Sequence, residues 1–184
     1  VKQYNLTAVI NPSVGEEMQF GGNIDASGDW LAVASPWTNS SKGRLELFQN
    51  DETGYLSRRL IDGHETGDFL GIQVSMQTNE LAVSSIGKVD IYSYAEGSGG
   101  WTKNENQTIV SNKDDGFGLS LDFFSDNLIV GAPFASGGGV AYIYKRQPAG
   151  WAVTSLSPAT TAGENAQFGF SSAIDMEANL AAVS

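Results

Sequence analysis

A sequence pattern that returns about every 50 residues constrains this chain more than any other feature. A glycine that opens an apolar segment recurs 50, 47 and 51 residues apart, at Gly21, Gly71, Gly118 and Gly169. A segment rich in Leu, Ala and Val follows each glycine, with intervals of 50, 47 and 52 residues between Leu31, Leu81, Leu128 and Leu180. Because two independent markers share one period, the sequence predicts an internally repeated structure.

Each repeat predicts four short antiparallel strands. The glycine marker and the leucine segment supply the first two. A third segment, which begins at Gly43, Gly87 or Gly139, has apolar residues at every second position, as in a strand with one face in a core. A glycine-aromatic pair then opens a fourth segment, at Gly54-Tyr55, Gly100-Trp101 and Gly150-Trp151. Turn-forming residues separate the segments and no sustained helical period occurs, so the fold class is all-β.

Four strands in about 50 residues is the size of one blade of a β-propeller. The expected segments are an outer strand of a preceding blade within 1–19, whole blades at 20–67, 68–115 and 116–166, and the first two strands of a further blade at 167–184. This makes fifteen strands, or about 3.7 blades. Because a propeller closes with at least four blades, the chain is expected to be part of a longer propeller. The alternative is that two or more copies complete a ring, with the edges at Val1–Ile10 and Ala181–Ser184 pairing outside this chain.

The third repeat resembles a known family. Phe117-Gly118, Gly131-Ala132-Pro133 and the segment 139–144 are similar to the FG-GAP repeat, which builds the propeller of integrin α subunits and of many bacterial surface proteins. The first and second repeats depart from the motif, with Ala34-Ser35-Pro36 and Ser84-Ser85 in place of Gly-Ala-Pro. The resemblance implies a seven-bladed ring located outside the cell or on its surface.

Charge and residue content narrow the function classes. With 21 acidic and 10 basic residues, the net charge of −11 argues against binding to nucleic acid or to an anionic membrane. No segment is apolar enough for membrane insertion. Cysteine is absent, there is no Gly-x-Ser-x-Gly motif, and the single histidine, His64, lies in a polar loop. These observations predict a protein that is not an enzyme, although acid–base work by carboxylate pairs stays a minor alternative.

The sequence also contains candidate sites for calcium binding and for glycan attachment. Integrin-type repeats often carry a calcium loop between the first two strands, and Asp25, Ser27 and Asp29 stand at the matching positions. An apolar Val33 replaces the closing carboxylate, so a hairpin turn is favoured and no cofactor is predicted. Sequons for N-glycosylation, which also arise by chance, begin at Asn5, Asn39 and Asn106.

A binding face is predicted from the connections between strands. Trp37 and Phe134 each follow the proline of a second-to-third connection. By the resemblance, these connections share a face with the fourth-to-first connections, which contain Asp62, His64, Asp68, Asp114 and Asp115. Aromatic rings beside polar groups suit a protein or carbohydrate ligand. Two alternatives stay open: the rings fold back as plugs, or the chain is a structural repeat unit of a large surface assembly.

Overall fold

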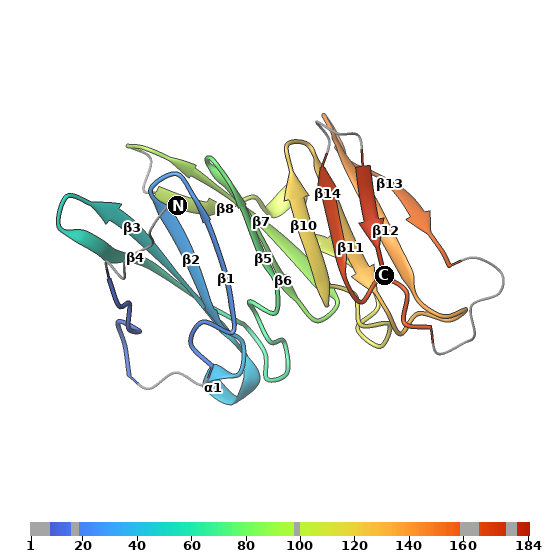
Figure 1. The fold of residues 1–184 in the computed structure, drawn as a ribbon, viewed down its shortest axis with the longest axis horizontal. Coiled ribbons are helices and arrows are strands. Elements are labelled where there is room, and N and C mark those ends of the chain that lie inside the picture. Colours follow the sequence, from blue (N-terminus) through green and yellow to red (C-terminus); the bar gives the residue numbers. More distant parts are fainter. Residues whose placement is uncertain (1–7, 16–18, 98–99, 159–165, 176–179) are drawn as a thin grey trace, which may run out of the picture.

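The computed structural model describes residues 8–15, 19–97, 100–158, 166–175 and 180–184 (Figure 1). It confirms an all-β protein with antiparallel four-stranded sheets. Sheet 1 comprises β1 (Asn23–Ser27), β2 (Trp30–Ser35), β3 (Arg44–Asp51) and β4 (Gly54–Asp62). Sheet 2 comprises β5 (Val74–Gln77), β6 (Glu80–Ser85), β7 (Lys88–Ala95) and β8 (Gly100–Lys103), with β9 (Ile109–Val110) also paired to β7. Sheet 3 comprises β10 (Ser120–Phe124), β11 (Asn127–Ala132), β12 (Val140–Gln147) and β13 (Gly150–Leu156), and sheet 4 comprises β14 (Ser172–Asp175) and β15 (Leu180–Val183).

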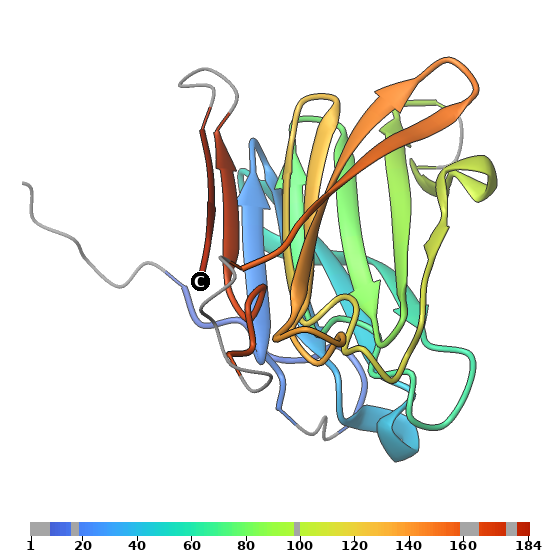
Figure 2. The same ribbon diagram turned by 90° about the vertical axis from the view of Figure 1, so that its right-hand side faces the viewer.

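The four sheets form a curved row in sequence order: sheets 1, 2 and 3 follow one another from left to right in Figure 1, and sheet 4 lies beside β10 and β11 of sheet 3 (Figures 1 and 2). The first strands of successive sheets, β1, β5, β10 and β14, are neighbours. Buried apolar side chains fill the space between sheets 1 and 2 and between sheets 2 and 3. The middle strands β6 and β11 are buried along almost their whole length, because both faces of their sheets are covered.

The sheets have two different edges. Two-residue turns such as Gly28-Asp29 and Thr78-Asn79 join the first and second strands, and we call this side the hairpin edge. The longer connections gather at the opposite side, the connection edge, at the bottom of Figure 1. Backbone hydrogen bonds tie the second-to-third connections to the fourth-to-first connections there, including Ile86 N to Asp68 O at 2.9 Å and Phe134 N to Asp115 O at 2.9 Å.

The repeated glycine is explained by packing between sheets. Gly71 and Gly118 adopt φ values of 91° and 97°, in the left-handed region that favours glycine. A Cβ on Gly71 would lie 2.6 Å from the Cβ of Ala34, and one on Gly118 would lie 2.7 Å from the carbonyl oxygen of Ser85. The marker glycine therefore lets each sheet pack closely against the end of the second strand of the preceding sheet, where the residues are small. We call these close contacts of Gly71 and Gly118 the glycine seats.

A second repeated contact sets the register between the first strands. The residue four positions after each marker glycine accepts a hydrogen bond from the backbone N–H five positions after the next marker glycine. These bonds are Met76 N to Asp25 Oδ2 at 2.7 Å, Phe123 N to Ser75 Oγ at 3.1 Å and Ile174 N to Asp122 Oδ2 at 2.8 Å. A short polar side chain at this position therefore holds one sheet to the next.

Two predicted strands differ from the structure. Residues 8–10 of the outer strand expected over Val1–Ile10 belong to no strand within this chain, and residues 1–7 fall outside the described part. The fourth strand of sheet 2 is broken by a 3₁₀ turn (Glu105–Gln107), which separates β8 from β9. The described residues thus contain the expected fifteen strands, but the fifteenth comes from this break and not from the N-terminal segment.

Helical turns are limited to this 3₁₀ turn and the four-residue α1 (Thr38–Ser41), in which Asn39 and Ser40 have positive φ, in the part of the chain that the structure describes. Neither element is long or apolar enough to span a membrane. At the far end of the row, β15 pairs with β14 alone among the described residues, so its other edge carries no strand there.

Candidate functional site

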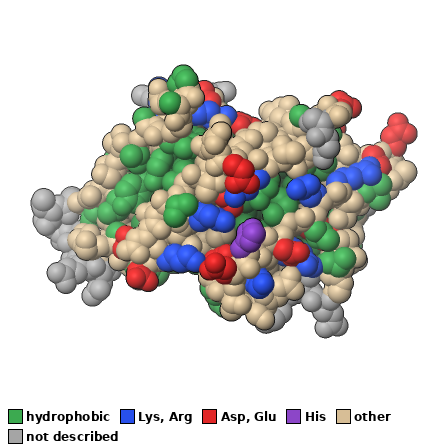
Figure 3. Space-filling model, turned by 180° about the vertical axis from the view of Figure 1, so that it is seen from behind, with side chains coloured by type: hydrophobic (Ala, Val, Ile, Leu, Met, Phe, Trp, Pro, Cys, Tyr) green, Lys and Arg blue, Asp and Glu red, His purple; other side chains and the backbone are tan. Residues whose placement is uncertain are grey.

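A groove opens at the connection edge above sheet 2 because one connection is short. Only Ile86 and Gly87 join β6 to β7, whereas the matching connections of sheets 1 and 3 span residues 36–43 and 133–139. Two adjoining cavities of about 190 Å³ and 350 Å³ lie there, and both are lined by His64, Asp68, Ser85 and Lys88. Figure 3 shows the single histidine on this face with basic and acidic side chains around it. We call this feature the groove.

The floor of the groove is a buried carboxylate shared by two lysines. Asp90 is 3% exposed, and its oxygens lie 3.0 Å from Lys88 Nζ and 3.2 Å from Lys103 Nζ. The Thr108 hydroxyl donates a further hydrogen bond to Asp90 at 2.9 Å. Burial alone would lower the pKa of Lys103, but the charges and hydrogen bonds of Asp90 and Glu105 raise this pKa above its usual value. Lys103 is therefore an ammonium group throughout the neutral pH range.

Tyr92 lies two residues beyond Asp90 on the same face of β7 and also lines the groove. Burial, and then the negative charge of Asp90, raise the pKa of Tyr92 to about 12. The phenol stays protonated at neutral pH, so its hydroxyl is a neutral hydrogen-bonding group.

The walls of the groove carry two acids that are already paired. Asp62 accepts hydrogen bonds from Arg44 Nε at 2.6 Å and from the side chain of Asn39 at 3.2 Å. Asp68 accepts from Lys113 Nζ at 3.1 Å and from the backbone N–H of Glu65 at 2.9 Å. Burial would raise the pKa of Asp68, but the Glu65 N–H and the nearby lysine charges outweigh it and lower this pKa below its usual value.

Every basic residue in and around the groove is paired, although five acidic and three basic residues line its two cavities. Four basic residues pair with four acidic ones here: Arg44, Lys88, Lys103 and Lys113 with Asp62, Asp68, Asp90 and Glu105. The net charge of −11 therefore resides on the rest of the chain. The ion pairs therefore weaken, inside the groove, the repulsion that an approaching anion meets over most of the surface.

The structure brings together three of the predicted site residues and leaves the others outside the groove. Asp62, His64 and Asp68 line it. Asp114 and Asp115 lie in the connection that follows β9. Asp114 is exposed, and Asp115 accepts a hydrogen bond from the Asn112 side chain at 3.3 Å.

The two predicted aromatic residues stand on the long connections of sheets 1 and 3. Trp37 is 45% exposed and packs edge-on against Phe69, with ring centroids 4.7 Å apart. Phe134 is 54% exposed, and its ring lies against Gly116. Each ring is in contact with a neighbouring residue and is about half exposed, so neither is a fully buried plug.

Sequence reasoning missed the lysines, Asp90 and Tyr92. The signal was present in β7, where Val89 and Ile91 alternate with Lys88, Asp90 and Tyr92. Both faces of sheet 2 are covered, so the second alternating set must face sheet 1. Charged residues in that set indicate a polar cluster between sheets.

The calcium alternative finds little support in the geometry. Both carboxylate oxygens of Asp25 accept backbone hydrogen bonds, one from Met76 and one from Ala26. Ser27 ends β1, and Asp29 belongs to the two-residue turn that follows it. Within the described ranges, no group of three or more His, Cys, Asp or Glu side chains is suitably placed for a metal ion.

The glycosylation sequons occupy three different settings. Asn5 lies outside the described residues. Asn39 is exposed, and its side-chain amide donates to Asp62. Asn106 is exposed on the 3₁₀ turn, and its sequon partner Thr108 bonds to Asp90.

Comparison with known proteins gives no relative from which a function could be inferred. No protein-family model matches the chain, and no curated protein matches its sequence at a significant level.

Proposed function

We propose that this chain is a segment of an FG-GAP-type β-propeller whose function is recognition and not catalysis. The four sheets are then successive blades, and their first strands line the axis of the ring. Support comes from the row of neighbouring first strands and from the glycine seats that repeat with the 50-residue period. Further blades of the same protein or another copy complete the ring, and the location is extracellular or at the cell surface.

The observation that carries a binding function is the groove. It is a concave site lined by paired lysine and acidic side chains, and exposed aromatic rings stand on the connections of the two neighbouring sheets. Four of its five acids are each paired with a cation, so these four serve as fixed hydrogen-bond acceptors. Such a surface suits a protein or a glycan that docks at the connection edge.

A comparison of variants on a glycan array and in pull-down from extracellular fluid tests this function. The groove variant is Lys88→Ala with Lys113→Ala, and the aromatic variant is Trp37→Ala with Phe134→Ala. Val153→Ser is the matched control, because Val153 is 56% exposed on β13 and outside the groove. We expect the groove variant to lose ligands, the aromatic variant to bind them more weakly and the control to retain them. An unchanged profile for a folded groove variant rules out this site.

A structural role in an assembly is the second candidate, and one observation favours it. Gly21 has the same left-handed conformation as its counterparts, with φ of 83°, yet among the described residues nothing lies within 4 Å of its Cβ position. Next to it Ile24 is 61% exposed, whereas its counterparts Val74 and Leu121 are 6% and 7% exposed. Light scattering coupled to chromatography separates the candidates, because ordered oligomers favour assembly and a monomer at all concentrations disfavours it.

A further inference from the structure

The floor of the groove holds more positive charge than its buried acid neutralises. Asp90 gives one oxygen to Lys88 and the other to Lys103, and both lysine side chains are 27% exposed. An ammonium group has three N–H donors, so Lys88 keeps two for a ligand after bonding to Asp90, and Lys103 keeps one after bonding to Asp90 and Glu105. Glu105 also contacts Lys103, but its side chain is 76% exposed and water screens this contact. Two adjacent ammonium groups therefore face the cavity from a partly desolvated position.

The walls offer the opposite chemistry. Asp62 and Asp68 already have cationic partners, so they do not require a cation from the ligand. A carboxylate can accept about four hydrogen bonds, and these two can therefore still accept from hydroxyl groups. The Ser85 hydroxyl and the His64 ring complete the polar lining. The ligand that matches this arrangement carries one anionic group for the floor and several hydroxyl groups for the walls.

We infer that the groove binds a hexuronic acid unit of a glycan, whose carboxylate bridges the ammonium groups of Lys88 and Lys103. This inference rests on the proposed recognition function of the same groove. The hydroxyl groups of the sugar ring lie against Asp62, Asp68 and Ser85, and the exposed Val110 offers an apolar contact for the C–H face of the next sugar. The acidic surface around the groove selects for one carboxylate in an otherwise neutral segment and against a densely charged polymer.

A sugar acid fits better than an acidic peptide. A uronic acid presents its carboxylate and its hydroxyl groups on one compact ring, which matches a cavity of about 190 Å³ with donors at its floor and acceptors at its walls. A glutamate or aspartate side chain brings a carboxylate without the hydroxyl groups that the walls would bind. An acidic peptide is therefore a comparison ligand in the test.

The test is an NMR titration with the methyl glycosides of D-glucuronate and D-glucose and with an acetylated, amidated Glu-containing tripeptide. We expect glucuronate to shift the backbone signals of Ser85–Asp90 and to bind about tenfold or more tightly than glucose, since a charge-assisted hydrogen bond is about twice as strong as a neutral one. Lys88→Met should weaken glucuronate binding about tenfold or more, whereas Lys88→Arg retains most of it. Lys145→Met is the matched control, because Lys145 is an exposed lysine on β12 and its loss changes the net charge equally.

The outcomes separate the two proposals. Equal binding of glucose and glucuronate, or glucuronate binding that Lys88→Met does not weaken while the variant melts like the wild type, overturns the acidic-sugar inference and leaves a recognition groove in place. Binding of the peptide in preference to glucuronate, with the same dependence on Lys88, also overturns it. If Lys88→Met does not fold, Lys103→Met gives the same reading, because Lys103 holds the other oxygen of Asp90. If no sugar or peptide perturbs the groove, and the array and pull-down profiles do not depend on it, both proposals fail.

Discussion

The interface between sheets 1 and 2 and the interface between sheets 2 and 3 are built on matching positions with opposite chemistry. At the hairpin edge of the first interface, Trp30 lies 4.9 Å from Tyr94 and 5.5 Å from Trp101, measured between ring centroids. In the second interface, strand register gives Glu80 the position that matches Trp30, and Arg146 the position that matches Tyr94. The third aromatic position is a tryptophan in both interfaces, Trp101 in the first and Trp151 in the second.

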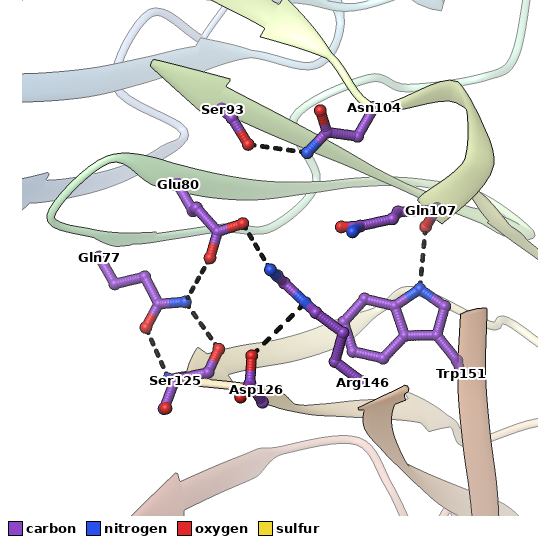
Figure 4. A network of polar contacts seen from close by, with 9 residues as sticks. All are labelled: Gln77, Glu80, Ser93, Asn104, Gln107, Ser125, Asp126, Arg146 and Trp151. Carbon is purple, nitrogen blue, oxygen red and sulfur yellow. Dashed lines mark hydrogen bonds and ion pairs between the residues drawn. The ribbon is translucent and has the colours of Figure 1, made fainter. Parts of the chain in front are cut away.

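An ion pair replaces the aromatic cluster in the second interface (Figure 4). Arg146 Nη1 lies 2.8 Å from Glu80 Oε1, and the guanidinium carbon lies 5.4 Å from the centroid of the Trp151 ring. Beside it, Gln77 and the backbone of Ser125 exchange two hydrogen bonds, of 2.6 Å and 2.8 Å. The cation is thus held between a carboxylate and an aromatic face.

The connection edge shows the reverse. The first interface has Asp90 and its two lysines there, and the second has Tyr142 at the position of Asp90, packed 5.9 Å from Phe117. Each interface therefore has one aromatic end and one polar end. The aromatic end is at the hairpin edge in the first interface and at the connection edge in the second. The glycine seats and the bonds between first strands are common to both, so the backbone contacts define the repeat and leave the side chains at each end free to form a site.

The largest test of this comparison is removal of the two equivalent tryptophans. Trp101 is 1% exposed in the aromatic cluster, so Trp101→Ala should lower the free energy of unfolding by about 3–5 kcal/mol. Trp151 is only half-buried, and Trp151→Ala should cost clearly less. Urea denaturation measures both. Equal losses would show that the polar end depends on its tryptophan as much as the aromatic end does.

The glycine seats should respond alike in both interfaces. Gly71→Ala and Gly118→Ala each force a Cβ into the preceding sheet at a positive φ, with an expected cost of about 2–4 kcal/mol. Gly21→Ala has the same backbone cost without the close contact and serves as the control, with an expected loss of about 1 kcal/mol. Thermal unfolding of the three variants measures the difference. A loss at Gly21 as large as at Gly118 would remove packing as the reason for the repeated glycine.

Most of the fold was predictable from the 50-residue period of the sequence. Alternating residues such as Val89 and Ile91 identified the strands, and the marker glycines identified the period, whereas their packing role became clear only from the structure. The break in the fourth strand of sheet 2 was not predictable from this pattern, because it depends on a contact with another sheet. The 3₁₀ turn presents the carbonyl oxygen of Gln107 to Trp151 Nε1 at 3.1 Å.

The groove was only half predictable for a related reason. Asp62, His64 and Asp68 stood out as polar residues in one connection. Their association with Asp90 required two facts that no local pattern contains: which face of β7 meets sheet 1, and that a two-residue connection leaves the space above sheet 2 open.

Replacing the ion pair at the hairpin edge of the second interface should have a moderate effect on the free energy of unfolding. Arg146→Met leaves Glu80 without its cation, and because the two side chains are 21% and 23% exposed we expect a loss of only about 1–2 kcal/mol. The double variant Glu80→Leu with Arg146→Met should recover to within about 1 kcal/mol of the wild type, since an apolar pair can replace a partly buried ion pair. A double-mutant cycle by urea denaturation measures this. Simple addition of the two single losses would show that the residues do not act as a pair.

The smallest effect concerns two tyrosines at equivalent positions of the two interfaces, Tyr92 and Tyr144. Each has a pKa raised to about 12, by burial first, and then by Asp90 for Tyr92 and by Tyr142 for Tyr144. A raised pKa in the folded state means that the stabilisation is fully present below pH 10, the ordinary value, and is lost as the pH rises towards 12. Phenolate absorbance during alkaline titration should therefore show Tyr92 and Tyr144 ionising late, and Tyr92→Phe and Tyr144→Phe should each remove one late component. Asp90→Asn should lower the pKa of Tyr92 and leave that of Tyr144 unchanged, because only the first interface has this carboxylate; an equal shift of both tyrosines would mean that the polar cluster is not confined to the groove.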